Sequence, residues 1–334
     1  MRIRGGRSFR TLMVAAVALV LAAGCSSGGA ATATPRLEKT DLNVAVVPAL
    51  DSAGFFVALY GGLFKAQGLN VHFTPATSSE TVIADQVKAQ FDITLGNYVS
   101  YIQAQQRRKA NLYIFAEASV MGPATQGIYT MPDSRITDLS GLEDKTIAIN
   151  APKNILYLLA ASVLAEHGVN PRLVRFVSVP FPNMTAKLQS GAVSAALLPE
   201  PFASGAEEAQ GVVPLADLNQ GATTAFPIAG YVVTKQWAAK YPHTLAAFYK
   251  AIEEGQQVAD TSRADVEAAM MDIPAPFGVS RQTAAVLALD SYPVSHGPAG
   301  SVDKIRLERV VNVMQQFIGF PKFNIDTMLM PAGP

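Results

Sequence analysis

Two carboxylates, Asp51 and Glu200, each stand in a short loop directly after a run of β-prone residues. A carboxylate in a binding site accepts hydrogen bonds from an amine or from a ring N–H. Each could instead cap a turn or pair across a hinge. Lys153 also follows a β-prone run, and it could neutralise an anion or simply be solvated. These side chains therefore predict binding chemistry only if the fold brings them together.

Small polar residues precede two predicted helices. Thr77, Ser78 and Ser79 stand before one of them, and Gly96-Asn97 stands before the other. The start of a helix has unpaired N–H groups and a partial positive charge, so it can bind an anion without any arginine. Plain capping of the helix by the same side chains is the alternative.

Four aromatic residues lie in or beside the same loops, namely Phe55, Tyr98, Phe181 and Phe202. Such rings could enclose a planar solute or line an apolar pocket. Phe55 falls within a predicted helix, where a position in the core is the alternative.

No pattern of residues typical of catalysis or metal binding occurs in the sequence. His72, His167, His243 and His296 are scattered, and no two of them are four residues apart. The spacing excludes the usual zinc motifs, and no glycine-rich nucleotide motif or serine-hydrolase motif is present. We therefore expect no metal, no cofactor and no enzyme activity.

The composition is that of a folded protein with no bias toward one charge. Hydrophobic residues make up 49% of the chain, and 26 basic residues balance 26 acidic ones. This excludes a disordered protein and argues against nucleic acid as a partner.

The N-terminal segment has the composition of an export signal. Four arginines precede the apolar run Leu12–Ala23, so we expect residues 1–24 to be a signal peptide. Cys25 is the only cysteine, and Leu21-Ala-Ala-Gly-Cys25 resembles a bacterial lipobox, which predicts lipidation of Cys25. Ordinary cleavage near Ala23 is the alternative. Residues 25–40 have the composition of a tether.

From Leu42 onward, short β-prone runs alternate with helical ones, which predicts α/β architecture with mostly parallel sheets and helices on both faces. Expected strands are 42–47, 70–74, 92–95, 112–116, 146–149, 174–178, 193–198, 211–215 and 228–234. The proline in 211–215 indicates an edge strand. Beyond Trp237 the chain is expected to be almost entirely helical.

Four motifs in order resemble solute-binding proteins of ABC importers, in the branch that handles sulfonates, nitrate and the pyrimidine precursor of thiamine. The first motif is Gly62-Leu-Phe-Lys-Ala-Gln-Gly-Leu-Asn-Val71. The others are Thr77-Ser-Ser79, Asp92-Ile-Thr-Leu-Gly96 and Leu198-Pro-Glu-Pro-Phe202. This resemblance covers roughly residues 41 to 320.

The resemblance implies a type II periplasmic-binding-protein fold with two lobes and two hinge crossovers. Residues 41–125 and 228–334 would form the first lobe, and residues 126–227 the second. The crossovers are expected near 120–132 and 222–231. The loops at the carboxyl ends of the parallel strands would face a cleft between the lobes.

These loops are 48–52, 76–79, 96–98, 150–154, 180–183 and 199–202. They predict the ligand-binding residues Asp51, Ser52, Phe55, Thr77, Ser78, Ser79, Gly96, Asn97, Tyr98, Asn150, Lys153, Asn154, Phe181, Asn183, Glu200 and Phe202. The family's pyrimidine binders often have Asn or Asp followed by His in the first loop, whereas Asp51 is followed by Ser52. Nor is the strong cationic set expected for a sulfonate or nitrate present. The loops therefore favour a small organic solute with a ring or an amine.

The predicted function is that of a monomeric, lipid-anchored receptor on the extracytoplasmic face of the cell membrane. It would capture a small solute and deliver it to an ABC permease and its ATPase. An enzyme on the same scaffold, resembling pyrimidine synthases or dehydratases, is one alternative. A sensory partner that presents the solute to a membrane receptor is another.

Overall fold

The structure is a computed structural model that describes residues 36–287 and 300–331. The predicted signal peptide, Cys25 and most of the predicted tether therefore lie outside the described residues. Among the described helices, none combines the length and the apolar character that a membrane crossing requires.

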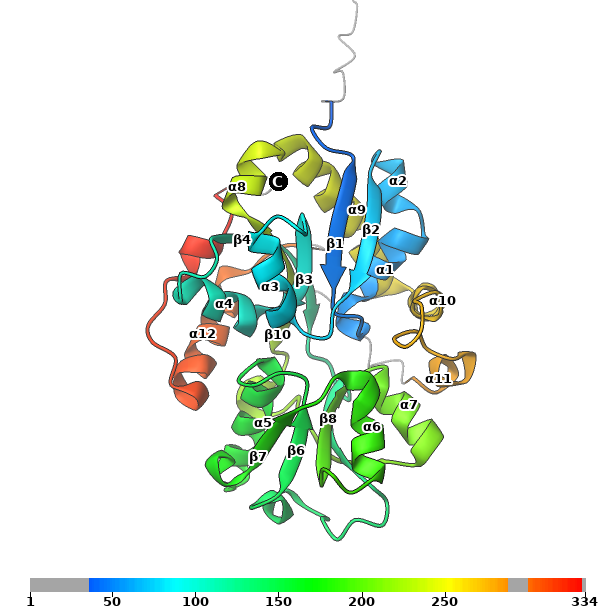
Figure 1. The fold of residues 1–334 in the computed structure, drawn as a ribbon, viewed down its shortest axis with the longest axis vertical. Helices are drawn as coiled ribbons and strands as arrows, with labels where there is room; N and C mark the ends of the chain where they lie inside the picture. Colours follow the sequence, from blue (N-terminus) through cyan, green and yellow to red (C-terminus); the bar gives the residue numbers. More distant parts are fainter. Residues whose placement is uncertain (1–35, 288–299, 332–334) are drawn as a thin grey trace, which may run out of the picture. The chain divides into compact units, whose positions relative to one another are not determined.

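The first sheet has the strand order β2-β1-β3-β10-β4 (Figure 1). Strands β1 (Asp41–Val46), β2 (Asn70–Pro75) and β3 (Ile93–Asn97) pair in parallel. Strand β10 (Pro227–Thr234) is antiparallel both to β3 and to β4 (Leu112–Val120).

The second sheet repeats this plan in the order β7-β6-β8-β5-β9. Strands β6 (Thr146–Ile149), β7 (Arg175–Ser178) and β8 (Ala195–Pro199) are parallel neighbours. Strand β5 (Gln126–Thr130) is antiparallel to β8 and to the edge strand β9 (Val213–Asp217). The α/β prediction with mostly parallel strands is confirmed, and each sheet adds one reversed strand.

The two reversed strands, β5 and β10, are those by which the chain enters each sheet from the other one. Residues 121–125 lead from β4 to β5, and residues 218–226 lead from β9 to β10. The sequence-based crossover of 120–132 was too long, because it missed β5 inside it. These entering strands place residues of the crossover next to the strand-end loops.

Helices connect and cover the sheets. Several helices lie between the strands of the first sheet in the sequence or follow its last strand. They are α1 (Ala53–Tyr60), α2 (Leu63–Ala66), α3 (Ser79–Val87), α4 (Tyr98–Gln106), α8 (Lys235–Lys240), α9 (Pro242–Thr261), α10 (Arg263–Met271) and α12 (Lys304–Ile318). Those connecting the second sheet are α5 (Ile155–Glu166), α6 (Phe181–Gln189) and α7 (Phe202–Gln210). Helix α9 packs on α1, which brings the C-terminal helices back to the first sheet. Helix α11 (Arg281–Val286) instead contacts α7, and α12 contacts both α4 and α5.

Aromatic packing fixes α1 against the first sheet. Phe55 and Phe56 are fully buried, and both lie within 6 Å of the ring of Phe73 on β2. Phe55 also packs on Phe64 of α2. Edge-to-face and tilted contacts of this kind contribute stability beyond that from the apolar area that the rings bury. They hold α1, whose start lies next to Asp51, against the first sheet.

Residues 38–40, predicted as part of the tether, belong to the folded unit. The carboxylate of Glu38 accepts hydrogen bonds from the backbone N–H groups of His243 (3.1 Å) and Thr244 (2.9 Å). These are orphan donors in the first turn of α9, so Glu38 acts as a cap supplied from a distant part of the chain. Burial alone would raise the pKa of Glu38, but the backbone hydrogen bonds outweigh it and lower the pKa to about 2.

Glu38→Ala is expected to lower the free energy of unfolding by about 1 kcal/mol at pH 7, the typical effect of a lost helix cap. The folded pKa lies below the ordinary value, so the stabilisation is present above about pH 4.5 and disappears as the pH falls toward 2. Urea unfolding at pH 7 and pH 2.5 measures this. The exposed Glu143→Ala is the control, and an equal loss at both pH values would contradict the capping role.

Candidate functional site

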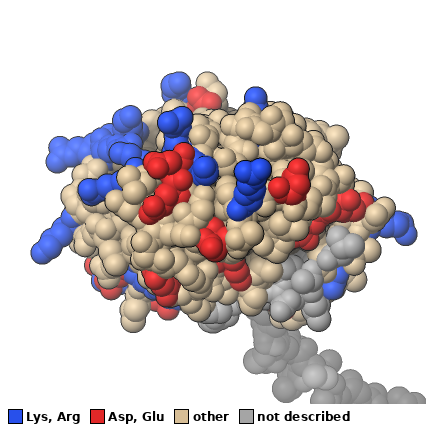
Figure 2. Space-filling model, turned by 90° about the horizontal axis from the view of Figure 1, so that it is seen from below, with Lys and Arg blue, Asp and Glu red and all other residues tan. Residues whose placement is uncertain are grey.

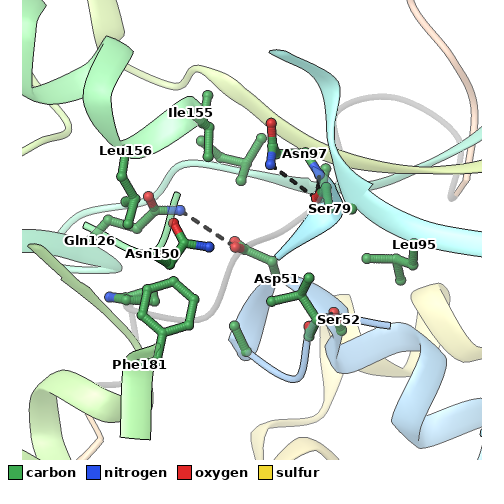
Figure 3. Close-up of a pocket in the computed structure, with 16 residues that line it drawn as sticks. Asp51, Ser52, Ser79, Leu95, Asn97, Gln126, Asn150, Ile155, Leu156 and Phe181 are labelled. Carbon is green, nitrogen blue, oxygen red and sulfur yellow. Dashed lines mark hydrogen bonds between the residues drawn. The ribbon is translucent and has the colours of Figure 1, made fainter. Parts of the chain in front are cut away.

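A cavity of about 40 Å³ lies where the strand-end loops of the two sheets meet (Figure 3). All six loops named from the sequence contribute to its lining, and β5 and β10 complete it. The lining residues are Val47, Ala49, Asp51, Ser52, Ser79, Leu95, Gly96, Asn97, Gln126, Asn150, Ile155, Leu156, Phe181, Pro199, Ile228 and Ala229. Seven of the predicted ligand-binding residues are therefore brought together at one place.

Asp51 lies in a short 3-10 helix, Leu50–Ser52, between β1 and α1. Its carboxylate accepts hydrogen bonds from the Ser119 hydroxyl (3.2 Å) and the Gln126 amide (3.5 Å). Burial raises the pKa of Asp51 to about 6, and the two hydrogen bonds oppose that rise. At neutral pH the cavity therefore holds a mostly ionised but poorly solvated carboxylate.

The Ser79 hydroxyl ties the starts of α3 and α4 together. It accepts hydrogen bonds from the backbone N–H (2.9 Å) and from Nδ2 (3.0 Å) of Asn97. Asn97 Oδ1 in turn accepts from the backbone N–H of Ser100 and caps α4. Ser78 occupies the N-cap position of α3 and is buried, but its side chain makes no capping hydrogen bond, so the alternative of plain capping does not hold for this residue.

Gly96 is required beside Ser79 because there is no room for a side chain. A Cβ atom built on Gly96 would lie 2.8 Å from Ser79 Cβ and 3.1 Å from the Tyr101 hydroxyl, and still closer to Ser79 Oγ. Gly96→Ala is therefore expected to displace Ser79, to cost about 2 kcal/mol of stability and to weaken solute binding.

Thermal unfolding and calorimetric titration of the Gly96→Ala variant measure these two effects. Gly211→Ala is a control for loss of glycine without crowding, because nothing lies within 4 Å of its added Cβ. That control carries only the strain of a positive φ at the end of α7. Unchanged stability and affinity in the Gly96 variant would contradict the crowding argument.

Asn150 and Asn154 form one hydrogen-bonded pair at the start of α5. Asn154 donates to Asn150 Oδ1, and Asn154 Oδ1 caps α5 by accepting from Tyr157 N–H. Asn150 Nδ2 reaches across to the carbonyl of the exposed Thr77 (3.4 Å). Asn150 thus lines the cavity, whereas Asn154 positions Asn150 and Thr77 offers only its backbone.

The aromatic wall of the cavity comes from the second sheet. Phe181 lines the cavity, and its ring is stacked on Phe202 with centroids 5.1 Å apart. Phe202 therefore supports Phe181 from outside the cavity. Asn183, predicted to bind the ligand, lies exposed within α6, which begins at Phe181, and it does not line the cavity.

Glu200 does not line the cavity. Its carboxylate accepts hydrogen bonds from the hydroxyl (2.9 Å) and the backbone N–H (3.2 Å) of Ser204. Burial raises the pKa of Glu200 to about 7, against the effect of these hydrogen bonds. Its carbonyl oxygen accepts from Leu50 N–H (2.8 Å), so Glu200 joins the two sheets through its backbone.

Three further predicted residues lie away from the cavity. Phe55 belongs to the aromatic core under α1, where the sequence had left a core position open. Tyr98 is fully buried, and its ring packs closely against Gly230 of β10. Lys153 is exposed, and its carbonyl accepts a hydrogen bond from Gln103 Nε2 (2.7 Å).

The sequence did not reveal Gln126 or Ser119, the two hydrogen-bond partners of Asp51. Both lie at the first crossover, Ser119 near the end of β4 and Gln126 at the start of β5. The available signal was a polar residue at the boundary of each apolar run, Ala-Ser119-Val and Thr-Gln126-Gly. The apolar lining residues Leu95, Ile155 and Ile228 could not be identified from the sequence, because nothing there distinguishes an apolar residue next to a cavity from one in the core.

The cavity carries one acidic group and no basic one. Among the described residues that line it, none is Lys, Arg or His. The described part of the chain also contains no group of three or more His, Cys, Asp or Glu side chains that could hold a metal ion. On the outer surface, acidic and basic side chains are interspersed on the face that Figure 2 shows.

A search of curated proteins finds a relative with a named transport role. The chain is 28% identical over 244 residues to the bicarbonate transport ATP-binding protein CmpC of Synechocystis sp.. The match covers 67% of this chain and 36% of that protein, so the chain spans about a third of the length of this relative.

Solved structures share the fold at low sequence identity. The ligand-binding component of an ABC-type import system from Staphylococcus aureus has a TM-score of 0.75 at 13% identity, over 88% of this chain and 97% of that one. The alkanesulfonate-binding protein SsuA of Xanthomonas axonopodis pv. citri has a TM-score of 0.71 at 14% identity, over 86% and 96%. The desulfurization enzyme DSZB also matches, with a TM-score of 0.62 at 17% identity, over 88% and 97%.

These matches confirm the two-sheet binding-protein fold that the motifs predicted, and with it the resemblance to solute-binding proteins of ABC importers. A family model describes the same part of the sequence, since it matches residues 36–273. This range contains every strand of both sheets and every residue that lines the cavity. The chain belongs to the NMT1-like family.

Proposed function

We propose that the protein is the extracytoplasmic solute-binding component of an ABC import system. It captures a small solute between the two sheets and delivers it to a permease. The observation that carries this proposal is the cavity itself, to which all six strand-end loops contribute. Family membership and the fold shared with import components support the same function.

Hydrogen bonds between the parts of the chain around the two sheets can couple capture of the solute to closure of the cavity. Leu50 N–H donates to the Glu200 carbonyl (2.8 Å), and Gln103 donates to the Lys153 carbonyl (2.7 Å). The link between Gln126 and Asp51 passes through the cavity. A solute that touches both sides adds contacts that exist only in the closed form, so it shifts the population toward closure.

Attachment to the membrane is part of this proposal and rests on the N-terminal sequence alone. The lipobox-like segment before Cys25 and the basic, apolar start support export and lipidation. Replacement of Cys25 by Ser is expected to move the protein from the membrane fraction to the soluble fraction. Continued retention of the variant in membranes would contradict lipidation.

An enzyme on the same scaffold is the second candidate, and the shared fold with DSZB is the observation that favours it. The lining of the cavity favours binding instead. Among the described lining residues there is no His, Lys or Cys, and Asp51 is the only group with a pKa near neutrality. General acid–base catalysis usually needs a partner for such a group.

Native mass spectrometry of the purified protein after dialysis against growth-medium extract tests the proposed function. We expect one small molecule to be retained, and to be recovered with its mass unchanged. Ala229→Leu, which fills the cavity, is expected to abolish retention, and Ala192→Leu on the surface is the control. A solute recovered in altered form would support the enzyme instead, and retention by the Ala229 variant would place binding elsewhere.

A further inference from the structure

Hydrogen-bond acceptors outnumber the available donors at the Asp51 side of the cavity. Gln126 is 2% exposed, and its Nε2 is directed at Asp51 Oδ2. Its Oε1 is buried and has no hydrogen-bond partner among the described residues. A buried acceptor without a donor is costly, and such groups are rare in folded proteins. An acceptor of this kind beside a carboxylate indicates a place for a donor from outside the chain.

Several side-chain donors around the cavity already have acceptors within the protein. Asn150 Nδ2 is directed to the Thr77 carbonyl. Asn97 Nδ2 is directed to Ser79 Oγ, and the Ser52 hydroxyl donates to the Val47 carbonyl (2.8 Å). Asn150, Asn97 and Ser52 thus each direct a donor toward an acceptor of the protein itself and away from a bound oxyanion. Figure 3 shows the Asp51 carboxylate and the Gln126 amide facing each other across the space.

No lysine, arginine or histidine occurs among the described residues that line the cavity. A buried carboxylate is stabilised by a cation, so a positively charged solute would supply what the chain does not. An oxyanion would instead stand close to Asp51 without any basic side chain to compensate. The charge of the lining and its hydrogen bonding therefore both favour a cationic donor over an oxyanion.

The size of the cavity limits the group that can occupy it. A cavity of about 40 Å³ holds the equivalent of roughly three waters, since one water needs about 10–15 Å³ in the same measure. A flat or compact group of three or four heavy atoms is of this size. The ring of Phe181 forms one wall, and an aromatic face attracts a flat cation.

We propose that the solute presents a small cationic N–H donor group, of the amidinium, guanidinium or primary ammonium class, to Asp51 and to Gln126 Oε1. This inference rests on the proposed function, and it names the chemistry of the solute that the same site captures. The proposed solute differs in charge from those named for the relatives, which are the oxyanions bicarbonate and alkanesulfonate. Asp51 carries the charge recognition, and Gln126 adds a second acceptor.

Isothermal titration calorimetry at pH 7.5 tests the proposal with two sets of probes. Acetamidinium and methylammonium chloride are the donors, and sodium methanesulfonate, nitrate and bicarbonate are the oxyanions. Only the donors are expected to bind. Asp51→Asn is expected to weaken their binding about 30-fold and Gln126→Leu about tenfold, as is typical for hydrogen bonds to a charged and to a neutral acceptor. The exposed Asp133→Asn removes the same charge elsewhere and should leave affinity unchanged.

Each contrary outcome separates this inference from the proposed function. Oxyanions that bind to the wild type, with affinity retained or improved in Asp51→Asn, would overturn the donor class but leave solute capture intact. Donor binding that Asp51→Asn does not weaken would place the donors outside the cavity and overturn the proposal. If neither set binds while mass spectrometry still shows a retained solute, the inference fails alone; if no solute is retained either, both fail.

Discussion

Asp51→Asn is expected to make the solute-free protein more stable at pH 7.5, by about 3 kcal/mol at most, while it removes the charge that we propose the solute needs. The reason is the raised pKa of the buried carboxyl, which moves from 3.8 to about 6. Each pKa unit corresponds to about 1.4 kcal/mol, so ionised Asp51 makes the native state less favourable by that total. Asparagine keeps the shape and the hydrogen bond from Ser119 without the charge.

The pH dependence of this gain has a definite sign. Above about pH 6, Asp51 is ionised in both the folded and the unfolded chain, and the full penalty of burying the charge applies. As the pH falls through 6 toward 4, the folded protein takes up the proton first and the penalty disappears. The advantage of the variant should therefore be largest at neutral pH and absent near pH 3.5.

Urea unfolding, followed by the fluorescence of Trp237, measures the stability of Asp51→Asn and of a control variant at pH 7.5 and pH 4. Trp237 is the only tryptophan of the chain. Asp133→Asn is the matched control, and it should change stability by less than about 0.5 kcal/mol. If Asp51→Asn were destabilising to the same extent at both pH values, Asp51 would have a structural role. A gain restricted to neutral pH would show a residue kept for binding at the expense of stability.

The order of elements could be predicted from the sequence because helices and strands have distinct hydrophobic periods. The strands of residues 70–74 and 146–149 are found within one residue of their predicted bounds. Strand β5 was missed because Gln126–Thr130 is short and lies next to a crossover, with nothing in its five residues that distinguishes a strand from an extended linker. The reversed direction of β5 and β10 depends on how the chain passes between sheets, which no local pattern records.

The polar loops of the candidate site could be predicted because strand-end loops of such a fold lie together. The roles of individual residues within the loops could not. Phe55 and Phe181 are both aromatic residues near a loop, yet one packs in the core under α1 and the other forms the cavity wall. The sequence also could not show that the side-chain donors of Asn97 and Asn150 are used internally, because that depends on distances across the two sheets.

A buried ion pair between α12 and β4 is expected to have a larger effect on the free energy of unfolding than Asp51. Arg306 on α12 donates to both carboxylate oxygens of Glu117 on β4, at 3.1 and 3.2 Å. The side chain of Glu117 is 2% exposed and that of Arg306 is 15% exposed. The pair therefore joins the C-terminal helix to the first sheet, on the strand that leads into the first crossover.

Arg306→Met is expected to lower the free energy of unfolding by about 3–5 kcal/mol, because it keeps a buried carboxylate while removing its cation. The double variant Glu117→Gln/Arg306→Met removes both charges and should recover at least half of this loss, since replacing a whole buried pair by neutral groups is often nearly neutral. Urea unfolding at pH 7.5 measures both, with the exposed Arg281→Met as the control. A double variant that is less stable than Arg306→Met would contradict this account, because the cost would then arise from lost packing of Arg306 and not from the unbalanced charge of Glu117.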